Sequence, residues 1–525
     1  MSWTAFTAHI SDTGTPNLFF HYAFRYWGIL LTWLVFILTM IWLICRVTVV
    51  PQIIRRSIRV ISFIIVIIMT FLCIRGFRLN GRPLSMSMRY LYVDKIIHSS
   101  AVINTPFAMA FQLKDISNVP QTYFNDRELS LIRNSLIVPP DTLQPNGKNI
   151  MLIVLESGGS IHSDIFSPVG ATPYSSSMSF VDSLTRESLI NLHFYGSGRS
   201  SAQGITQLLA GVPFFGSGES YYVNSKQSDI PKDTPAILLK SIGYDTRFYY
   251  GCDEGNFHID ETAKVSGFDN LFNRGTFGDD SQYDGVWGIW DKPMGKYVAE
   301  DLSQVSKPFF ATWFTVTAHS PYTLPDSEDI SNYKYTEGPA QSMEYTDRAI
   351  RSFFNIARLQ SWYCNTIFII TSDHGQRDYF GSEYSEDPYV SNHLPFIIFA
   401  PDGSIPNQII TDTPMGQIDV APTILHLAGY NEPYISMGSS LFDNTKGHYA
   451  LASLCSAYYV YGTKYMVAFE APDKLFAVYD IRETPYPHTE LTEYDLQEIN
   501  RMSDWFKALM QDYTERIYNN RMQYQ

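Results

Sequence analysis

The chain has 525 residues, more than one ordinary domain needs, although large α/β domains can exceed the usual size. Hydrophobic residues make up 45% and charged residues 17%, which allows a large core and excludes broad disorder. The formal net charge is −14 and no basic stripe with interleaved aromatics stands out, so nucleic acid is not expected as a partner. The five cysteines show neither metal-finger nor redox spacing, and their odd number indicates no disulfide framework.

Two uncharged apolar runs near the start predict transmembrane helices at about residues 26–45 and 60–77. The first, YWGILLTWLVFILTMIWLIC, has the roughly 20 apolar residues that a span needs, and arginines beside the shorter second run can snorkel. A pair of buried core helices is the alternative. The loop between the runs is arginine-rich, which favours a cytoplasmic loop and an extracytoplasmic position for the rest of the chain.

Composition divides the chain into three parts. Residues 1–80 form the predicted membrane anchor, and residues 81–148 form a helical connector that ends in the proline- and glycine-rich stretch VPPDTLQPNGKN. Residues 149–525 form one large domain. No internal repeat or low-complexity tract stands out.

The large domain alternates strand-like and helix-like patterns. Apolar runs such as NIMLIVLES, PFFATWFTVTAHSPY, NTIFIITSDHG and LPFIIFAP predict strands, whereas YTDRAIRSFFNIARLQ and QIDVAPTILHLAGY predict helices. This alternation predicts a largely parallel sheet covered by helices on both faces. After Gly447 come short strand patterns and one long final helix, which we interpret as a small antiparallel extension of the same sheet.

Polar side chains follow two of the apolar strands directly. Glu156 ends one run, and Asp373 and His374 end another. Ligands bind at the carboxyl ends of strands in open α/β sheets, and two carboxylates with one imidazole suit Mn²⁺, Zn²⁺ or Mg²⁺. We therefore predict a metal site, while a helix N-cap for Glu156 and a plain turn for the Asp-His-Gly sequence remain the structural alternatives.

Two adjacent serines precede a helical pattern in the stretch YGSGRSSAQGITQLLAGVP. A serine at a helix N-terminus sits where backbone N–H groups favour an anion, and a nearby divalent cation would lower the pKa of its hydroxyl. We predict that Ser200 is the nucleophile, that Ser201 is a cap or supporting partner, and that Arg199 pairs with a phosphate or sulfate oxygen. An ordinary N-cap serine is the alternative.

The motifs NIMLIVLES, GSGRSS, TAHSPY, TSDHG and GQIDVAPTILHLAGY together resemble the alkaline phosphatase superfamily. Within it, the chain is similar to membrane-anchored sulfatase-like proteins of the lipoteichoic-acid-synthase type, as in Bacteroidetes, from Asn149 to about Phe442. The resemblance implies a three-layer α/β/α sandwich behind N-terminal transmembrane helices. Because members usually carry more spans, two spans here fit a shortened start.

The resemblance also implies roles for single residues. It implies one divalent ion, with Mn²⁺ favoured over Zn²⁺ or Mg²⁺, held by four residues: Glu156, Ser200, Asp373 and His374. His319 matches the catalytic histidine of the substrate pocket, and Asp253 matches a pocket aspartate. His258 stands where the group has a tryptophan, and Ile259 and Asp260 stand where its phosphate-binding arginine is expected. His393 is either a further substrate-binding residue or a structural loop histidine.

These features predict a metal-dependent phosphotransferase or phosphodiesterase at a bacterial inner membrane, with its catalytic domain on the periplasmic side. It would transfer a phosphoglycerol- or phosphoethanolamine-type group from a membrane phospholipid to an envelope glycan or lipid. A sulfatase is one alternative, but formylglycine formation needs an arginine where Gly204 stands. A catalytically inactive, membrane-anchored binding domain is the other.

Overall fold

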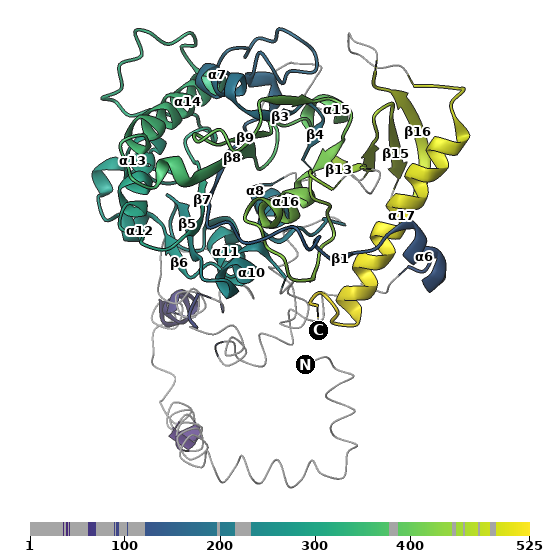
Figure 1. The fold of residues 1–525 in the computed structure, drawn as a ribbon. Helices are drawn as coiled ribbons and strands as arrows, with labels where there is room; N and C mark the ends of the chain where they lie inside the picture. Colours follow the sequence, from purple (N-terminus) through teal and green to yellow (C-terminus); the bar gives the residue numbers. More distant parts are fainter. Residues whose placement is uncertain are drawn as a thin grey trace. The chain divides into compact units, whose positions relative to one another are not determined.

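The computed structural model describes residues 121–524 apart from seven short gaps, together with scattered earlier positions. The gaps are at 197–199, 216–232, 377–386, 444–447, 455–456, 471–472 and 483–489. The chain divides into two compact units, of which one comprises residues 87–102 and 117–525 and is described below (Figure 1). The other comprises residues 1–86 and 103–116.

Most of the two predicted transmembrane segments lies outside the described residues. Residues 61–69 of the second segment are helical, and their large apolar side chains are 46–66% exposed. Within the part of the chain that the structure describes, no helix is both long enough and apolar enough to cross a bilayer.

A mixed sheet forms the centre of the large unit (Figure 1). Among the described residues it has eight strands in the order β10-β3-β9-β8-β2-β7-β5-β6, and only β9 runs antiparallel to its neighbours. The central strands β2, β7 and β8 are buried along their whole length and mostly apolar, because both faces of the sheet are covered. In chain order the strands are β2 (Asn149–Leu155), β3 (Leu189–Asn191), β5 (Asp245–Tyr250), β6 (Asn270–Phe272), β7 (Phe309–Phe314), β8 (Thr366–Ser372), β9 (Ile397–Phe399) and β10 (Gln408–Ile410).

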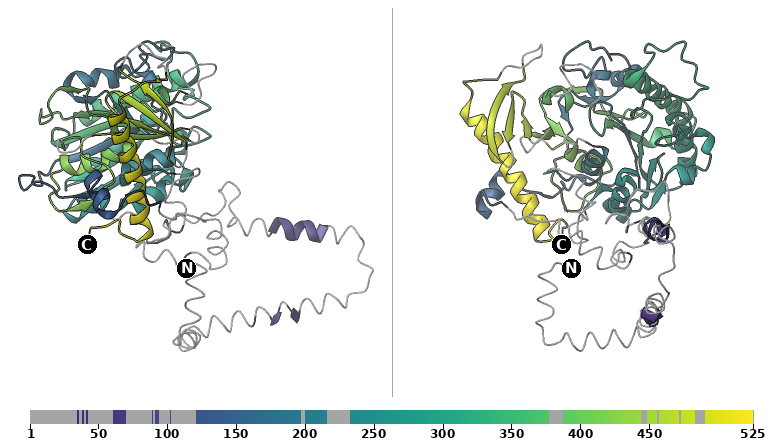
Figure 2. Two further views of the ribbon diagram at one scale, coloured as in Figure 1. Left: turned by 90° about the vertical axis from the view of Figure 1, so that its right-hand side faces the viewer. Right: turned by 180° about the vertical axis from the view of Figure 1, so that it is seen from behind.

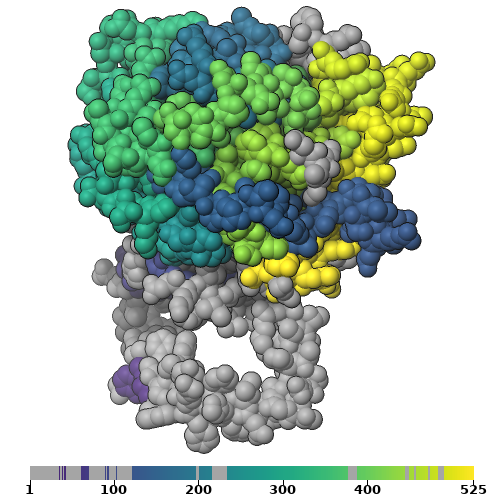
Figure 3. Space-filling model, viewed as in Figure 1, coloured from purple at the N-terminus to yellow at the C-terminus, as the bar shows by residue number. Residues whose placement is uncertain are grey.

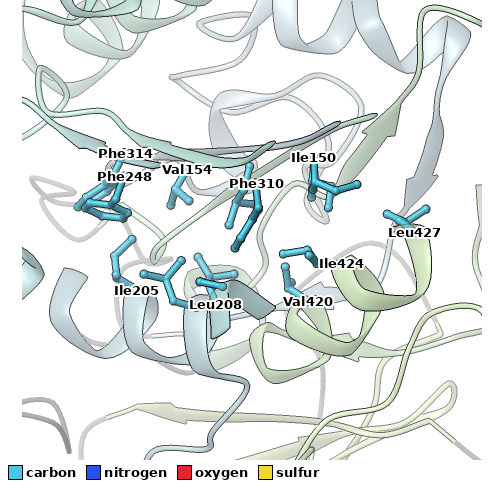
Figure 4. Packing of buried hydrophobic residues seen from close by; sticks show 14 of the residues in the cluster. Ile150, Val154, Ile205, Leu208, Phe248, Phe310, Phe314, Val420, Ile424 and Leu427 are labelled. Carbon is cyan, nitrogen blue, oxygen red and sulfur yellow. The ribbon is translucent and has the colours of Figure 1, made fainter. Parts of the chain in front are cut away.

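Helices cover the sheet on both faces, so the predicted three-layer α/β/α fold is confirmed. One core contains side chains of the sheet and of four helices: α8 (Ser201–Ala210), α10 (Pro235–Ser241), α11 (Ile259–Val265) and α16 (Val420–Leu427). Figure 4 shows Ile205 and Leu208 of α8 and Ile424 of α16 packed beneath Val154 and Phe310 of the sheet. The opposite core is closed by α7 (Ser179–Leu184), α13 (Asp291–Leu302) and α14 (Gly338–Ala357).

The C-terminal strands form a separate sheet, which corrects the expected extension of the central one. They are β13 (Ala450–Leu454), β14 (Ala457–Tyr461), β15 (Tyr465–Glu470) and β16 (Lys474–Asp480), and they pair as an antiparallel meander. Among the described residues none of them pairs with the central sheet. The predicted final helix is α17 (Leu496–Tyr518), which packs on this second sheet (Figures 1 and 2).

The described end of the predicted connector packs against the C-terminal part of the same unit. Helix α6 (Asp126–Ile132) lies beside α17, where the N–H groups of Tyr123 and Phe124 donate to Gln511 Oε1 (Figure 3). Strand β1 (Leu136–Ile137) then pairs with β12 (Tyr434–Ile435). This segment therefore leads the chain to the start of β2, where the candidate site begins.

Candidate metal centre

Three metal-ligating side chains meet at the carboxyl ends of β2 and β8. The two strands are parallel neighbours, and the register pairs Leu155 with Ser372, so the next residues, Glu156 and Asp373, are side by side. One ligand atom from each of Glu156, Asp373 and His374 lies within 4.8 Å of the other two. All three side chains are buried. The expected Glu-Asp-His grouping is thus present.

Backbone N–H groups orient the Asp373 carboxylate. Oδ1 accepts from the N–H of Ser157 at 2.9 Å and from that of His374 at 2.8 Å. Oδ2 is buried and accepts no hydrogen bond from the described residues, although His374 Nε2 lies 3.2 Å away. A buried carboxylate oxygen without a donor is costly unless a cation faces it, so this donor set fits a divalent metal ion.

The tautomer of His374 also suits a metal ligand. Its Nδ1 lies 2.9 Å from the carbonyl oxygen of Gly375, which can only accept, so Nδ1 carries the proton. Nε2 then presents a lone pair toward Glu156 Oε1, 3.8 Å away. Ser157 donates its hydroxyl to the same Glu156 oxygen at 2.8 Å, with its backbone at φ 55°. Such a left-handed serine is strained and marks a position fixed by its surroundings.

The N-terminus of α8 brings the hydroxyl of Ser201 to this cluster. Ser201 Oγ donates to Glu156 Oε2 at 3.1 Å and lies 3.4 Å from His374 Nε2. Ser200 is the N-cap residue, with extended backbone and no hydrogen bond from its side chain to the helix N-terminus. Ser200 is partly exposed, whereas Ser201 is buried. The structure therefore brings the hydroxyl of Ser201 to the metal-ligating groups and leaves that of Ser200 at the more open position.

The helix approaches the metal-ligating loop very closely at Gly204. A Cβ atom added there would lie 2.0 Å from the carbonyl oxygen of Asp373, so no other residue fits without displacement. Gln417 fixes the same carbonyl from the other side, where its Nε2 donates at 2.7 Å. The arginine of the formylglycine motif therefore has no room at position 204.

A small pocket opens beside Glu156. His319 lies in its wall and is partly exposed; its Nδ1–H donates to the carbonyl of Ser320 at 2.8 Å. The ring centroids of Trp287 and His319 are 4.3 Å apart, and those of Phe257 and Trp287 are 5.0 Å apart. The lining consists of Glu156, Tyr250, Cys252, Phe257, Trp287, Val316 and His319. The sequence interpretation placed His319 here and missed the two aromatic neighbours.

Asp253 and His258 lie near this pocket but do not line it. Asp253 is exposed and pairs with Arg274 at 3.3 Å, while Arg274 also pairs with Asp280 at 2.8 Å. His258 has φ 60° and places its Nδ1 3.4 Å from Glu261 Oε1. The aromatic side chains that line the pocket are Tyr250, Phe257 and Trp287, together with the His319 ring. Arg199 lies outside the described residues.

His393 occupies a structural position, the second of the two roles left open for it. It is 2% exposed, and its Nε2–H donates to the carbonyl of Leu192 at 2.7 Å. Its ring packs edge-on against Tyr195, and burial lowers the pKa of the imidazole to about 3. A neutral, enclosed histidine of this kind has no face open to substrate, so its expected substrate contact is corrected.

Three supporting residues of the site were not singled out from the sequence. Ser157 follows Glu156 directly, and Ser372 Oγ accepts the N–H of Gly158 at 2.8 Å while it donates to the carbonyls of Leu155 and His374. Gln417 comes from a distant turn before α16. The two serines adjoin predicted metal ligands in the motifs NIMLIVLES and TSDHG, and Gln417 lies in the motif GQIDVAPTILHLAGY. These motifs were the signal that could have drawn attention to all three residues.

Comparison with known proteins shows relatives over most of this unit. The lipoteichoic acid synthase 1 of Bacillus subtilis is 27% identical over 314 residues, 56% of this chain and 48% of that protein. The lipoteichoic acid synthase of Staphylococcus aureus is 29% identical over 278 residues, 49% of this chain and 41% of that protein. The chain thus spans about half the length of the curated relatives it matches.

Solved structures show the same fold. A protein of the alkaline phosphatase superfamily from Vibrio parahaemolyticus matches with a TM-score of 0.65 and 25% identity, covering 77% of this chain and 98% of its own. A lipoteichoic acid synthase from Listeria monocytogenes matches with a TM-score of 0.59 and 20% identity, covering 75% and 99%. The sulfatase family model matches residues 148–430, which is more than half of the chain. The chain belongs to the sulfatase family, within the alkaline phosphatase superfamily of enzymes.

Proposed function

We propose that this chain is a metal-dependent phosphotransferase that takes a phosphoglycerol- or phosphoethanolamine-type group from a membrane phospholipid. The observation that carries the proposal is the buried Glu156, Asp373 and His374 cluster against the N-terminus of α8, where two serine hydroxyls are available. A divalent ion held by these residues, Mn²⁺ by preference, would lower the pKa of a neighbouring hydroxyl and stabilise phosphoryl charge. The similarity to lipoteichoic acid synthases supports a phosphoglycerol donor.

Ser200 is the nucleophile in this proposal. Its hydroxyl makes no capping hydrogen bond and is partly exposed, so a bulky phosphodiester can reach it. Ser201 is buried and already donates to Glu156, a contact that suits a residue orienting the metal ligand. The two serines are therefore given different roles despite their adjacency.

The reaction has two steps. Ser200 loses its proton to solvent, and its oxygen forms a bond to phosphorus as the bond to the diacylglycerol oxygen breaks; His319 donates a proton to that leaving oxygen. A glycan, lipid or water hydroxyl then gives its proton to His319 and attacks phosphorus, which releases the Ser200 oxygen. The N–H groups at the start of α8 face the charge that develops on the phosphoryl oxygens.

The proposed setting is the extracytoplasmic face of a bacterial inner membrane. The uncharged run at 26–45 and the exposed apolar side chains of helical residues 61–69 support a membrane anchor. An anchor would keep the site close to a phospholipid donor and raise its effective concentration. The domain assignment follows from this: an anchor at 1–80, a connector at 81–148 and a catalytic domain at 149–525.

The test uses the full chain in detergent with Mn²⁺ and vesicles of phosphatidylglycerol or phosphatidylethanolamine. We expect diacylglycerol release and a peptide carrying the headgroup phosphate on Ser200, identified by fragmentation mass spectrometry. An adduct on Ser201 would reverse the two roles. Absence of any adduct, together with unchanged activity in Ser200→Ala, would overturn the proposal.

Sulfate-ester hydrolysis remains the second candidate because of the family model. The close contact at Gly204 disfavours it by the formylglycine route, since the motif's arginine cannot stand there. An unmodified mass for the Ser200 peptide with retained activity would exclude that route. Failure of the wild-type chain to bind stoichiometric metal would instead favour an inactive binding domain.

A further inference from the structure

Asp291 is a buried carboxylate at the start of α13, outside the metal cluster. It is 1% exposed, and its four hydrogen bonds all link it to the segment after β7 or to the neighbouring helix α14. Oδ1 accepts from the N–H of Val316 at 2.7 Å, and Oδ2 accepts from the N–H of Thr317 at 3.2 Å. The Thr346 hydroxyl donates to Oδ2 at 2.7 Å, and the N–H of Asp291 donates to Thr317 Oγ1 at 3.0 Å.

The segment that Asp291 holds connects two residues of the site. Thr315 Oγ1 accepts the N–H of Glu156 at 2.8 Å, so the first residue of the segment fixes a metal ligand. The carbonyl of Val316 accepts the N–H of His319 at 3.1 Å. Two hydrogen bonds on opposite sides of Val316 thus lead from the Asp291 carboxylate to the backbone of His319, and Val316 itself lines the pocket.

We propose that Asp291 is a positioning residue that holds His319 at the distance needed for proton transfer to the leaving oxygen. The inference rests on the proposed function, because it assigns Asp291 to the proton-transfer half of that reaction. Few other groups could hold the segment: a carboxylate accepts both N–H groups and a hydroxyl at once, which an amide or a hydroxyl side chain cannot do. Loss of one acceptor would leave a buried N–H unpaired and let the segment shift.

The chemistry of the leaving group provides the decisive readout. Diacylglycerol leaves as a strongly basic alkoxide unless it is protonated, whereas p-nitrophenolate is stable and leaves without a proton. A misplaced His319 therefore slows the first-turnover release of diacylglycerol and spares the first-turnover release of p-nitrophenolate from bis(p-nitrophenyl) phosphate. The second step, in which His319 accepts a proton, is the same for both substrates and follows the departure of the leaving group. A general disturbance of the metal site slows both substrates equally.

Asp291→Asn is the first variant, because the amide keeps the shape and loses one acceptor. We expect the first-turnover rate of diacylglycerol release to fall about 10- to 100-fold, as for a modest misplacement of a reacting group, with much less change in the first-turnover release of p-nitrophenolate. Asp347→Asn is the matched control, since Asp347 is also a buried carboxylate that accepts backbone N–H groups, but from Phe180 and Val181 of α7 and not from the segment after β7. It should leave both activities unchanged.

A double-mutant cycle with His319→Ala completes the test. If Asp291 acts through His319, Asp291→Asn adds no further loss in the His319→Ala background. Should Asp291→Asn fail to fold, Thr346→Val removes one contact on Oδ2 and should show a smaller loss of the same kind. Equal losses on both substrates, or additive losses in the cycle, would overturn the inference. Absence of wild-type activity on either substrate would instead contradict the proposed function.

Discussion

Ser201 Oγ donates a hydrogen bond of 3.1 Å to Glu156 Oε2, which joins the N-terminus of α8 directly to the end of β2. Removal of this hydroxyl leaves the carboxylate with one donor fewer but keeps both ligand oxygens. The side chain of the neighbouring Ser200 makes no capping hydrogen bond to α8. The two serines therefore lead to different expected outcomes.

Ser200→Ala should abolish turnover and the headgroup adduct, because the attacking oxygen is gone. Ser201→Ala should retain the adduct and lose about 10- to 100-fold in activity or metal affinity, the usual cost of removing a partner of a metal ligand. Steady-state kinetics and peptide mass spectrometry on both variants check this. The reverse order of effects would assign the nucleophile to Ser201.

Removal of the metal should affect both stability and activity. Because an ion bound to the folded state alone stabilises it, the melting temperature of the wild-type chain should rise with added Mn²⁺ and fall on chelation. Asp373→Asn should abolish the response, since it replaces one of the two carboxylates of the cluster. Calorimetry and metal analysis provide the measurement; an unchanged metal content in Asp373→Asn would contradict the site.

Gly204→Ala should destabilise the fold and weaken the metal site together. The new methyl group would overlap the Asp373 carbonyl, and overpacking of this kind costs about 1–3 kcal/mol in the free energy of unfolding. Gly275→Ala is the control, because the nearest atom to its added Cβ is the side-chain Oδ1 of Asn273 at 3.3 Å. Denaturant unfolding measures both. If the free energy of unfolding of Gly204→Ala equals that of the wild type, α8 can move away from the Asp373 loop without cost.

Trp287→Leu should raise KM for phospholipid more than it lowers kcat. Trp287 lines the pocket beside His319 but contributes no metal ligand, so its loss removes contact area for the headgroup and leaves the reacting groups in place. His258→Leu should have a smaller effect, since His258 is directed to Glu261. Kinetics on matched vesicles compare the two. A larger rise in KM for His258→Leu than for Trp287→Leu would indicate that His258 contacts the substrate.

Burial raises the pKa of Asp347 from 3.8 to about 7. The unfolded chain therefore ionises this group at lower pH than the folded chain, and the folded state loses stability as pH rises from about 4 to 7, by up to about 1.4 kcal/mol per pH unit. Asp347→Asn should remove this contribution. Unfolding curves at several pH values measure the free energy of unfolding of both chains. The wild-type value should fall relative to that of Asp347→Asn as pH rises toward 7. A difference that stays constant with pH would contradict the raised pKa.

The sequence predicted the parts of the site that follow strands. Glu156 and Asp373 could be placed together because each comes directly after an apolar run, and parallel neighbours end at the same edge. The buried cores on both faces of the sheet follow from the same patterns. These predictions succeeded because a run of apolar residues reveals both a buried strand and the residue at which it ends.

Other features of the site depend on tertiary packing and could not be predicted from the sequence. Which of Ser200 and Ser201 contacts Glu156 depends on how α8 is rotated about its axis against the sheet. Burial of His393 against Tyr195 depends on the second sheet. The alternation of apolar and polar residues in its strands does not reveal which strands they pair with or which side chains they cover. Trp287 reaches the pocket from a turn with no periodic pattern.

The close approach at Gly204 lies apart from the side chains that line the pocket. At Gly204 the main chain of the helix that follows the serines lies directly against the main chain of the loop that carries Asp373. We therefore expect that side chains of the pocket wall, such as Trp287, can be exchanged while the proposed nucleophile keeps its place relative to the Glu156, Asp373 and His374 cluster. One reaction geometry can in this way serve different headgroups, which makes the wall, and not the metal cluster, the place where a change of donor would arise.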